Sequence, residues 1–124
     1  MAFIVIGGTI ANSPVQKERN LKVLPKDISD EKLDSIMHVY NKALGVTCNF
    51  CHVKPAVLAF GSNDTLDYAS DKEPMKENAR DMMRMVIELN SKYFYFNKEQ
   101  KPEYLTTITC KMCHQGQAMP PEYH

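Results

Sequence analysis

Two short stretches decide how this chain of 124 residues is expected to fold: Cys48–His52, which reads CNFCH, and Cys110–His114, which reads CKMCH. Both have the pattern C-x-x-C-H, and together they contain all four cysteines of the chain. A single match to this pattern has modest specificity. Two matches that use every cysteine, each followed at once by a histidine, are a strong signal.

The chemistry of haem attachment explains this spacing. Two thiols three positions apart can add to the two vinyl groups of one haem, and the next residue then lies under the ring, where its imidazole can bind the iron. C-x-x-C-H is the attachment signature of c-type haem. The sequence therefore predicts two covalently bound haem c groups. Their attachment residues are Cys48, Cys51 and His52 for the first haem, and Cys110, Cys113 and His114 for the second.

Four cysteines could also bind zinc or form disulfides. Pairs of the form C-x-x-C also occur in zinc ribbons, but the sixty-two positions between Cys48 and Cys110 exceed the usual compact knuckle. Disulfides are the second alternative in an exported chain. A C-x-x-C disulfide is normally redox-active, and neither pair follows a thioredoxin-like strand.

Composition limits the class of protein. Fifteen Lys and Arg balance fifteen Asp and Glu, so a general nucleic-acid binder is not expected. Mean hydropathy is −0.39, and no apolar run reaches the length of a membrane-spanning helix. The length fits one domain, which we assign to residues 14–124.

Residues 1–13 are set apart from that domain. They begin MAFIVIGGTIA, an apolar run with a small-residue end, which is typical of the last part of a secretory signal. The positively charged segment of such a signal is missing, and an ordinary N-terminal strand is the alternative. The expected location is therefore periplasmic or exported, with association to a membrane through this segment left open.

The first expected helix covers residues 30–44. Ser29 is a good N-cap, acidic residues fill the first turn, and Gly45 is placed as the residue that ends the helix. An extended lead-in, residues 20–28, precedes it. One apolar stripe follows the helical period: Leu33, Ile36, Met37, Tyr40 and Leu44.

A long connection without regular structure is expected over residues 55–71, followed by a second helix over residues 74–92. Pro74 suits its first turn. Its apolar stripe is Met75, Ala79, Met82, Val86, Leu89 and Tyr93. An aromatic patch, a polar loop and a short apolar segment then lead to the second motif. A helix followed by C-x-x-C-H thus occurs twice.

Each haem iron needs a second axial ligand, for which thioether sulfur is well suited. Met37 lies on the first stripe, eleven residues before Cys48, and its rival His38 points about 100° away around the helix. For the second haem Met82 is preferred because it lies at the centre of its stripe. Met83 and Met85 stay open as alternatives, as does a gap-filling core role for all these methionines.

The stretches Met37–His52, Ala79–Asn90 and Cys110–Pro121 carry a resemblance. In them the chain, from about residue 20 to residue 121, resembles the family of the photosynthetic reaction-centre cytochrome c subunit. The resemblance implies haems bound on helix, turn and C-x-x-C-H units, with a methionine of the preceding helix as distal ligand. This role carries over to Met37, and less securely to Met82. Full-length members have four haem sites rather than two, so a reaction centre is not inferred as partner.

The expected fold is mainly α, a small multihaem c-type cytochrome whose helix–turn–C-x-x-C-H units surround two covalent haems. The expected function is electron transfer between redox partner proteins, with His/Met ligation leaving neither iron open. The alternative is a dihaem peroxidase-like enzyme with one open haem. Because so small a chain has little core of its own, it is expected to be largely unfolded without haem.

Overall fold

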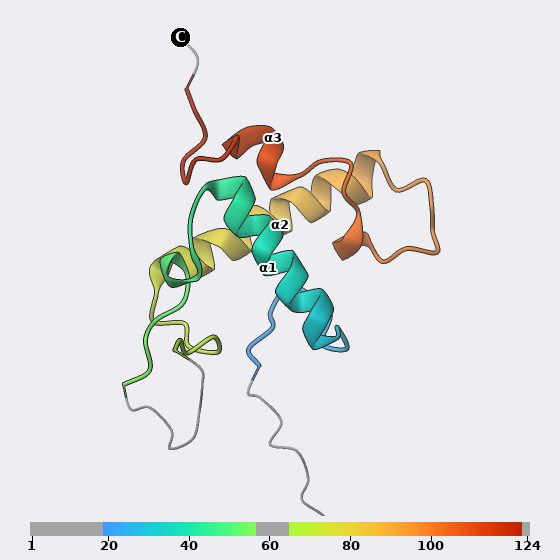
Figure 1. Ribbon diagram of the computed structural model, residues 1–124. Helices are drawn as coiled ribbons and strands as arrows, with labels where there is room; N and C mark the ends of the chain where they lie inside the picture. The colour runs from blue at the N-terminus through green and yellow to red at the C-terminus, as the bar shows by residue number, and fades with distance from the viewer. Residues whose placement is uncertain (1–18, 57–64, 123–124) are drawn as a thin grey trace, which may run out of the picture.

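The computed structural model describes residues 19–56 and 65–122, and within these ranges the protein is helical, with no β-strand. Three α-helices and two short 3-10 turns follow one another along the chain (Figure 1). The predicted mainly α class is confirmed. The elements are α1 (Asp30–Leu44), η1 (Cys48–Phe50), α2 (Pro74–Tyr93), η2 (Pro102–Tyr104) and α3 (Cys110–His114).

Helix α1 has the ends that its local sequence predicts. The Ser29 side chain accepts a hydrogen bond from the backbone N–H of Lys32 at 3.2 Å, which is the usual N-cap contact. At the other end Gly45 adopts the left-handed conformation, with φ 64°, and its N–H donates to the carbonyl of Asn41. Both ends are therefore fixed by residues adjacent to the helix.

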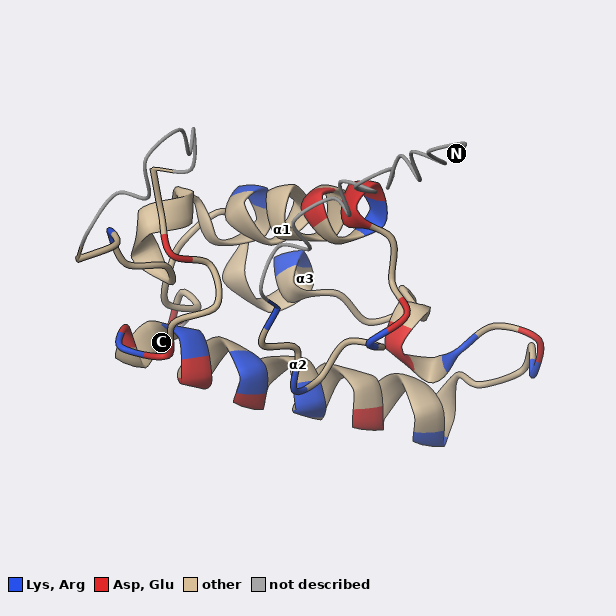
Figure 2. Cartoon of the chain, turned by 90° about the horizontal axis from the view of Figure 1, so that it is seen from below, with Lys and Arg blue, Asp and Glu red and all other residues tan. Residues whose placement is uncertain are grey.

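Helix α2 begins at Pro74, whose missing N–H costs nothing in a first turn. Glu73 caps it by accepting from the N–H of Met75 at 3.4 Å. Lys and Arg positions alternate with Asp and Glu positions along this helix (Figure 2). Among them, Arg84 pairs with Glu77 and Asp81 at 3.1 and 2.6 Å. This face is solvated, so the other faces must make the contacts of the helix.

The short helix α3 packs against α1, whereas η2 packs against α2. In Figure 1, α1 crosses in front of α2, and α3 lies at the C-terminal end of α1. Side-by-side packing of two long helices is not seen: within the described ranges, close backbone contact between α1 and α2 is nearly lacking. The two long helices therefore do not build a common core by direct packing.

The apolar core of the described residues is very small. Only Leu24, Ile28 and Ala43 are buried apolar side chains. The three buried residues of α2 are instead polar: Lys76, Arg80 and Asn90. The predicted apolar stripe of α2 lies partly open, since Met82 and Leu89 are 45% and 36% exposed. The buried face of this helix is thus a different face from the apolar stripe.

Lys76 organises the connection that precedes α2. Its ammonium donates to the carbonyls of Tyr68, Ala69 and Ser70 at 3.0, 3.1 and 2.6 Å. The nearby Asp71 carboxylate lies 3.2 Å from Lys76 and 2.8 Å from Arg80. These contacts give residues 68–71 a fixed course without regular secondary structure, as expected for the described part of this connection.

Within the described residues, one β-bridge joins Val53 to Asp67. These two residues lie on either side of residues 57–64, which the structure leaves undescribed. The hydrogen bond from Asp67 N to Val53 O is 2.7 Å. The predicted export segment, residues 1–13, lies outside the described residues. None of the described helices is both long and apolar enough to cross a membrane.

Candidate functional site

The first C-x-x-C-H motif forms a tight turn directly after α1. The N–H groups of Cys51 and His52 both donate to the carbonyl of Cys48, at 3.3 and 3.0 Å. Positions i, i+3 and i+4 of a helical turn lie on one side of it. The turn therefore brings the two thiols and the imidazole of the motif to the same side of the backbone.

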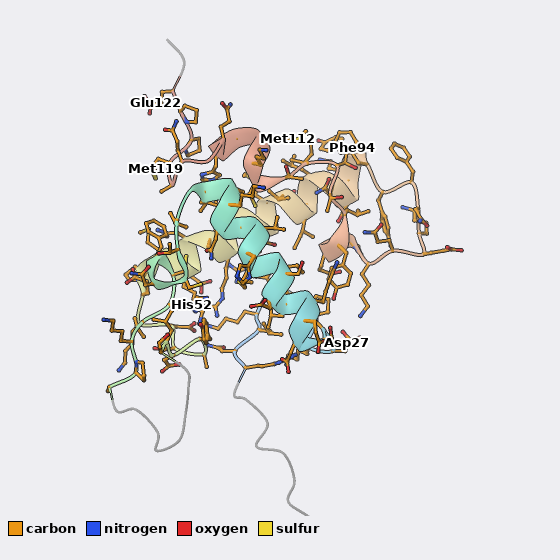
Figure 3. All side chains as sticks on the ribbon, viewed as in Figure 1. Asp27, His52, Phe94, Met112, Met119 and Glu122 are labelled. Atoms are coloured by element: carbon orange, nitrogen blue, oxygen red, sulfur yellow. The ribbon has the colours of Figure 1, made fainter. Side chains whose placement is uncertain are left out.

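His52 is half-buried and faces the connection before α2. Its ring meets the ring of Tyr68 edge-on, with centroids 5.0 Å apart and an interplanar angle of 62°. Burial, and then the charge of Lys76, lower the pKa of His52, which favours the neutral imidazole, while a backbone hydrogen bond with Tyr68 acts in the opposite direction. His52 is labelled in Figure 3. Its Nδ1 is buried without a hydrogen-bond partner, a state that native structures usually explain by strain, a bound water, an ion or a functional role.

The second motif is the whole of α3. This helix ends at Gln115, whose φ of 53° makes it a left-handed cap, and the N–H of Gln115 donates to the carbonyl of Lys111. Nδ1 of His114 lies 3.1 Å from the carbonyl oxygen of Gln117. In that contact Nδ1 carries the proton and donates, because a carbonyl can only accept. Nε2 of His114 is then the nitrogen free to bind a metal ion.

The four cysteines are free thiols and form no disulfide. Burial raises the pKa of Cys51, with a further contribution from Glu73. Burial also raises the pKa of Cys110, and the charge of Cys113 adds to it. A reactive thiol of a redox C-x-x-C pair has a lowered pKa. Cys51 and Cys110 therefore do not have the lowered pKa of such a thiol.

The last turn of α1 touches a cysteine of each motif. Asn41 Nδ2 donates to Sγ of Cys48 at 3.4 Å. The adjacent residue, Tyr40, lies near Cys110 of the second motif; burial, and then the charge of Cys110, raise the pKa of Tyr40 to about 12. Sequence reasoning assigned α1 to the first motif alone. The structure gives it contacts with both.

The candidate methionine ligands differ in exposure. Met37 is half-buried on α1, and Met83 is half-buried on α2. Met82 and Met85 are each 45% exposed. The rival of Met37, His38, is exposed, and its Nδ1 contacts the carbonyl of Asp34 in its own helix at 2.9 Å. It is therefore held along the surface of α1.

Three polar residues that support the site were missed by the sequence analysis. Asn90 is fully buried and fixes the backbone that leads into α3. Lys76 holds the loop that carries Tyr68, and Arg80 donates to the carbonyl of Asn20 at 3.0 Å. The sequence places these three residues on one face of the helix together with Ile87, but it gives no sign that this face is buried. A polar side chain on a helix is predicted to face solvent when its distant partner is unknown.

The two cysteine pairs are not gathered into one metal site. Among the residues that the structure describes, which include both motifs, no three Cys, His, Asp or Glu side chains are arranged to hold a metal ion. The chain matches no protein-family model, no curated protein and no solved structure. A functional assignment consequently has to come from the two motifs and their surroundings.

Proposed function

We propose that this protein is a dihaem c-type cytochrome that transfers electrons, with one haem attached at each C-x-x-C-H motif. The observation that carries the proposal is the arrangement of the motifs. Each closes within about one turn of backbone, which keeps its two cysteines and its histidine close together. Two thioether bonds and one iron ligand can come from such a turn. Bound haem iron supplies reversible one-electron chemistry between its ferrous and ferric forms.

The state of the two histidines supports this assignment. Nδ1 of His114 lies against the carbonyl oxygen of Gln117, which orients the ring and leaves Nε2 available. His52 is kept neutral by burial and has one buried ring nitrogen without a partner. A neutral imidazole with a free nitrogen is the form that binds iron. The two rings therefore suit the role of axial ligands.

The thin apolar core also fits two bound porphyrins. Three buried apolar side chains are few for residues 19–56 and 65–122, which the structure describes. On α2, a row of apolar side chains remains open on one face: Met82, Met85, Leu89 and Tyr93, which are 45%, 45%, 36% and 55% exposed. An apolar ring seated against this row would remove it from water. Two large apolar groups would supply the core that the polypeptide lacks.

Methionine sulfur is the proposed second ligand at each site. Met37 is assigned to the site of His52, and Met82 to the site of His114, with Met83 and Met85 as alternatives. A thioether stabilises ferrous iron relative to a second imidazole. With two protein ligands on each iron, neither site can bind substrate, which distinguishes an electron carrier from a dihaem peroxidase with one open haem.

The proposed carrier works between donor and acceptor proteins outside the cytoplasm, in the periplasm or an equivalent compartment. The apolar residues 1–13 are proposed to direct this export or to attach the chain to a membrane. The balanced charge of the chain supports protein partners rather than nucleic acid. The same balance predicts that encounter with these partners is not driven by a large net charge.

Haem stoichiometry and attachment test the proposal. Full-length protein made with a c-type maturation system is expected to give two haem c per chain in a pyridine haemochrome assay. On a denaturing gel, haem should stay with the chain. The double change Cys48→Ala with Cys51→Ala should halve the haem, and so should Cys110→Ala with Cys113→Ala. Extraction of all haem by acid acetone would show that attachment is not covalent.

Carbon monoxide distinguishes the electron carrier from the enzyme. A reduced protein with both irons capped is expected to leave its visible spectrum nearly unchanged under carbon monoxide. Ready binding at one haem, together with turnover of peroxide, would instead support the dihaem peroxidase. The readout is the Soret band of the reduced protein before and after addition of the gas.

A further inference from the structure

The turns that flank the two motifs touch each other through glycine backbone. A Cβ atom added to Gly45 would overlap the carbonyl oxygen of Gly116 and come within 2.9 Å of its carbonyl carbon. The N–H of Gly116 donates to the carbonyl of Ala43 at 2.8 Å. The approach is so close that no side chain fits at position 45.

This contact lies next to both motifs. Gly45 is three residues before Cys48, and Gly116 is two residues after His114. Each glycine has a positive φ, 64° at position 45 and 85° at position 116, so each turns the chain sharply. Gly45 is the cap of α1, and Gly116 directly follows Gln115, the cap of α3. Only two residues separate Gly45 from Cys48, and one separates Gly116 from His114, so the contact lies within a short length of chain from each motif.

We propose that the Gly45–Gly116 contact sets the separation of the two haem sites, and with it the rate at which an electron passes between them. The inference rests on the proposed function. In the exchange, one electron leaves the reduced site, which is oxidised, and enters the other, which is reduced; no bond forms or breaks. Electronic overlap decays exponentially with distance, so a small displacement of one motif changes the rate. Gly45 is the positioning residue in this role, and its partner is the backbone of Gly116.

The chain offers a matched pair of variants. Gly45→Ala and Gly116→Ala both place a Cβ on a residue with positive φ, so both carry the same kind of backbone strain. Only Gly45→Ala creates an overlap, because a Cβ at position 116 meets no atom within 4 Å. A difference between the variants therefore reports the contact rather than the strain.

The experiment uses the haem-loaded full chain. Exchange between the two haems is measured from the broadening of haem methyl NMR signals at half reduction, and the exchange of the Gly116 amide proton with solvent is followed in the same samples. We expect Gly116→Ala to resemble the unaltered protein. Gly45→Ala should exchange electrons several-fold more slowly and should lose protection of the Gly116 amide. Equal behaviour of the two variants would overturn the proposal.

A second pair of variants decides the matter if Gly45→Ala fails to fold. One glycine inserted between Gln115 and Gly116 lengthens the link from the contact to the second motif without adding a side chain. One glycine inserted between Ala118 and Met119 lies beyond the contact and is the control. Slower exchange in the first insertion alone supports the proposal, and unchanged exchange in it overturns the proposal. Absence of covalent haem from the unaltered protein would instead refute the proposed function.

Discussion

The side chain of Asn90 binds the backbone of Ile108 at both its donor and its acceptor. Nδ2 donates to the Ile108 carbonyl at 2.9 Å, and Oδ1 accepts from the Ile108 N–H at 2.8 Å. A third hydrogen bond runs from Nδ2 to the carbonyl of Leu105 at 3.3 Å. A fully buried amide on α2 thus fixes the segment that delivers α3.

Replacing this amide is expected to destabilise the protein and to loosen the second motif. Asn90→Ala leaves the N–H and carbonyl of Ile108 without partners, which should cost about 2 to 4 kcal/mol. Urea unfolding measures the loss, and haem staining of the Cys110–Cys113 site should fall. Asn78→Ala is the control, because Asn78 is an exposed residue of the same helix. Equal stability of the two variants would contradict this assignment to Asn90.

Met37→Ala is expected to affect only the haem attached at His52. Loss of the sulfur ligand opens one coordination position, so the reduced variant should bind carbon monoxide at about one haem per chain. Met37→His should keep the iron six-coordinate and lower its reduction potential. Val39→Ala, at an exposed position of the same helix, should change neither property. Unaltered spectra in Met37→Ala would remove Met37 from the ligand set.

Single substitutions distinguish the candidate methionine ligands on α2. Met82→Ala is expected to open the haem attached at His114 to carbon monoxide, whereas Met83→Ala and Met85→Ala should leave it closed. Met75→Ala serves as the control from the first turn of the helix. If Met85→Ala opens the site and Met82→Ala does not, the ligand lies three residues farther along the helix, and electron transfer remains the proposed function.

The carboxyl group of Asp71 makes the stability of the fold depend on pH. Its hydrogen bond from Lys22, at 2.6 Å, is the main cause that lowers the pKa of Asp71 well below its usual range, and Arg80 and Lys76 add to it. The group therefore stabilises the fold above the unfolded pKa of about 4, and this contribution is lost as pH falls towards the folded pKa. The difference in melting temperature between the unaltered protein and Asp71→Asn should shrink below about pH 4. A difference in melting temperature that stays constant as the pH falls would refute this role of Asp71.

The chain made without haem is expected to be largely unfolded. Its described core holds three buried apolar side chains, which are too few to offset the entropy of ordering the backbone. Protein produced in the cytoplasm without a maturation system should show weak helical circular dichroism and rapid proteolysis. Exported, matured protein should resist both. A stably helical apoprotein would show that the polypeptide needs no added core.

The features that local sequence controls were predicted, and those that depend on distant partners were not. Ser29 and Gly45 act within a few residues of themselves, so the bounds of α1 were predicted in full. Pro74 likewise marked the start of α2, and its predicted end differs by one residue. Arg80, by contrast, meets the carbonyl of Asn20, sixty positions away. Nothing near Arg80 in the sequence indicates such a partner.

The same distinction holds for the candidate site. The turns that bear the cysteines follow from the motifs themselves. The nearness of Gly116 to Gly45 and of Cys110 to Tyr40 depends on how α3 docks on α1. Residues 94–109, which connect α2 to α3, show no pattern that sets this docking. It depends on Asn90, whose amide gives no sign in the sequence of being buried.

The ammonium of Lys76 binds three carbonyl oxygens, those of residues 68–70, as a free cation could. Because this cation is tethered to α2, its effective concentration at the loop is fixed by the chain and does not follow the ionic composition of the surroundings. The loop that carries Tyr68 to the ring of His52 therefore has its counter-charge built in. Its shape does not depend on a free cation.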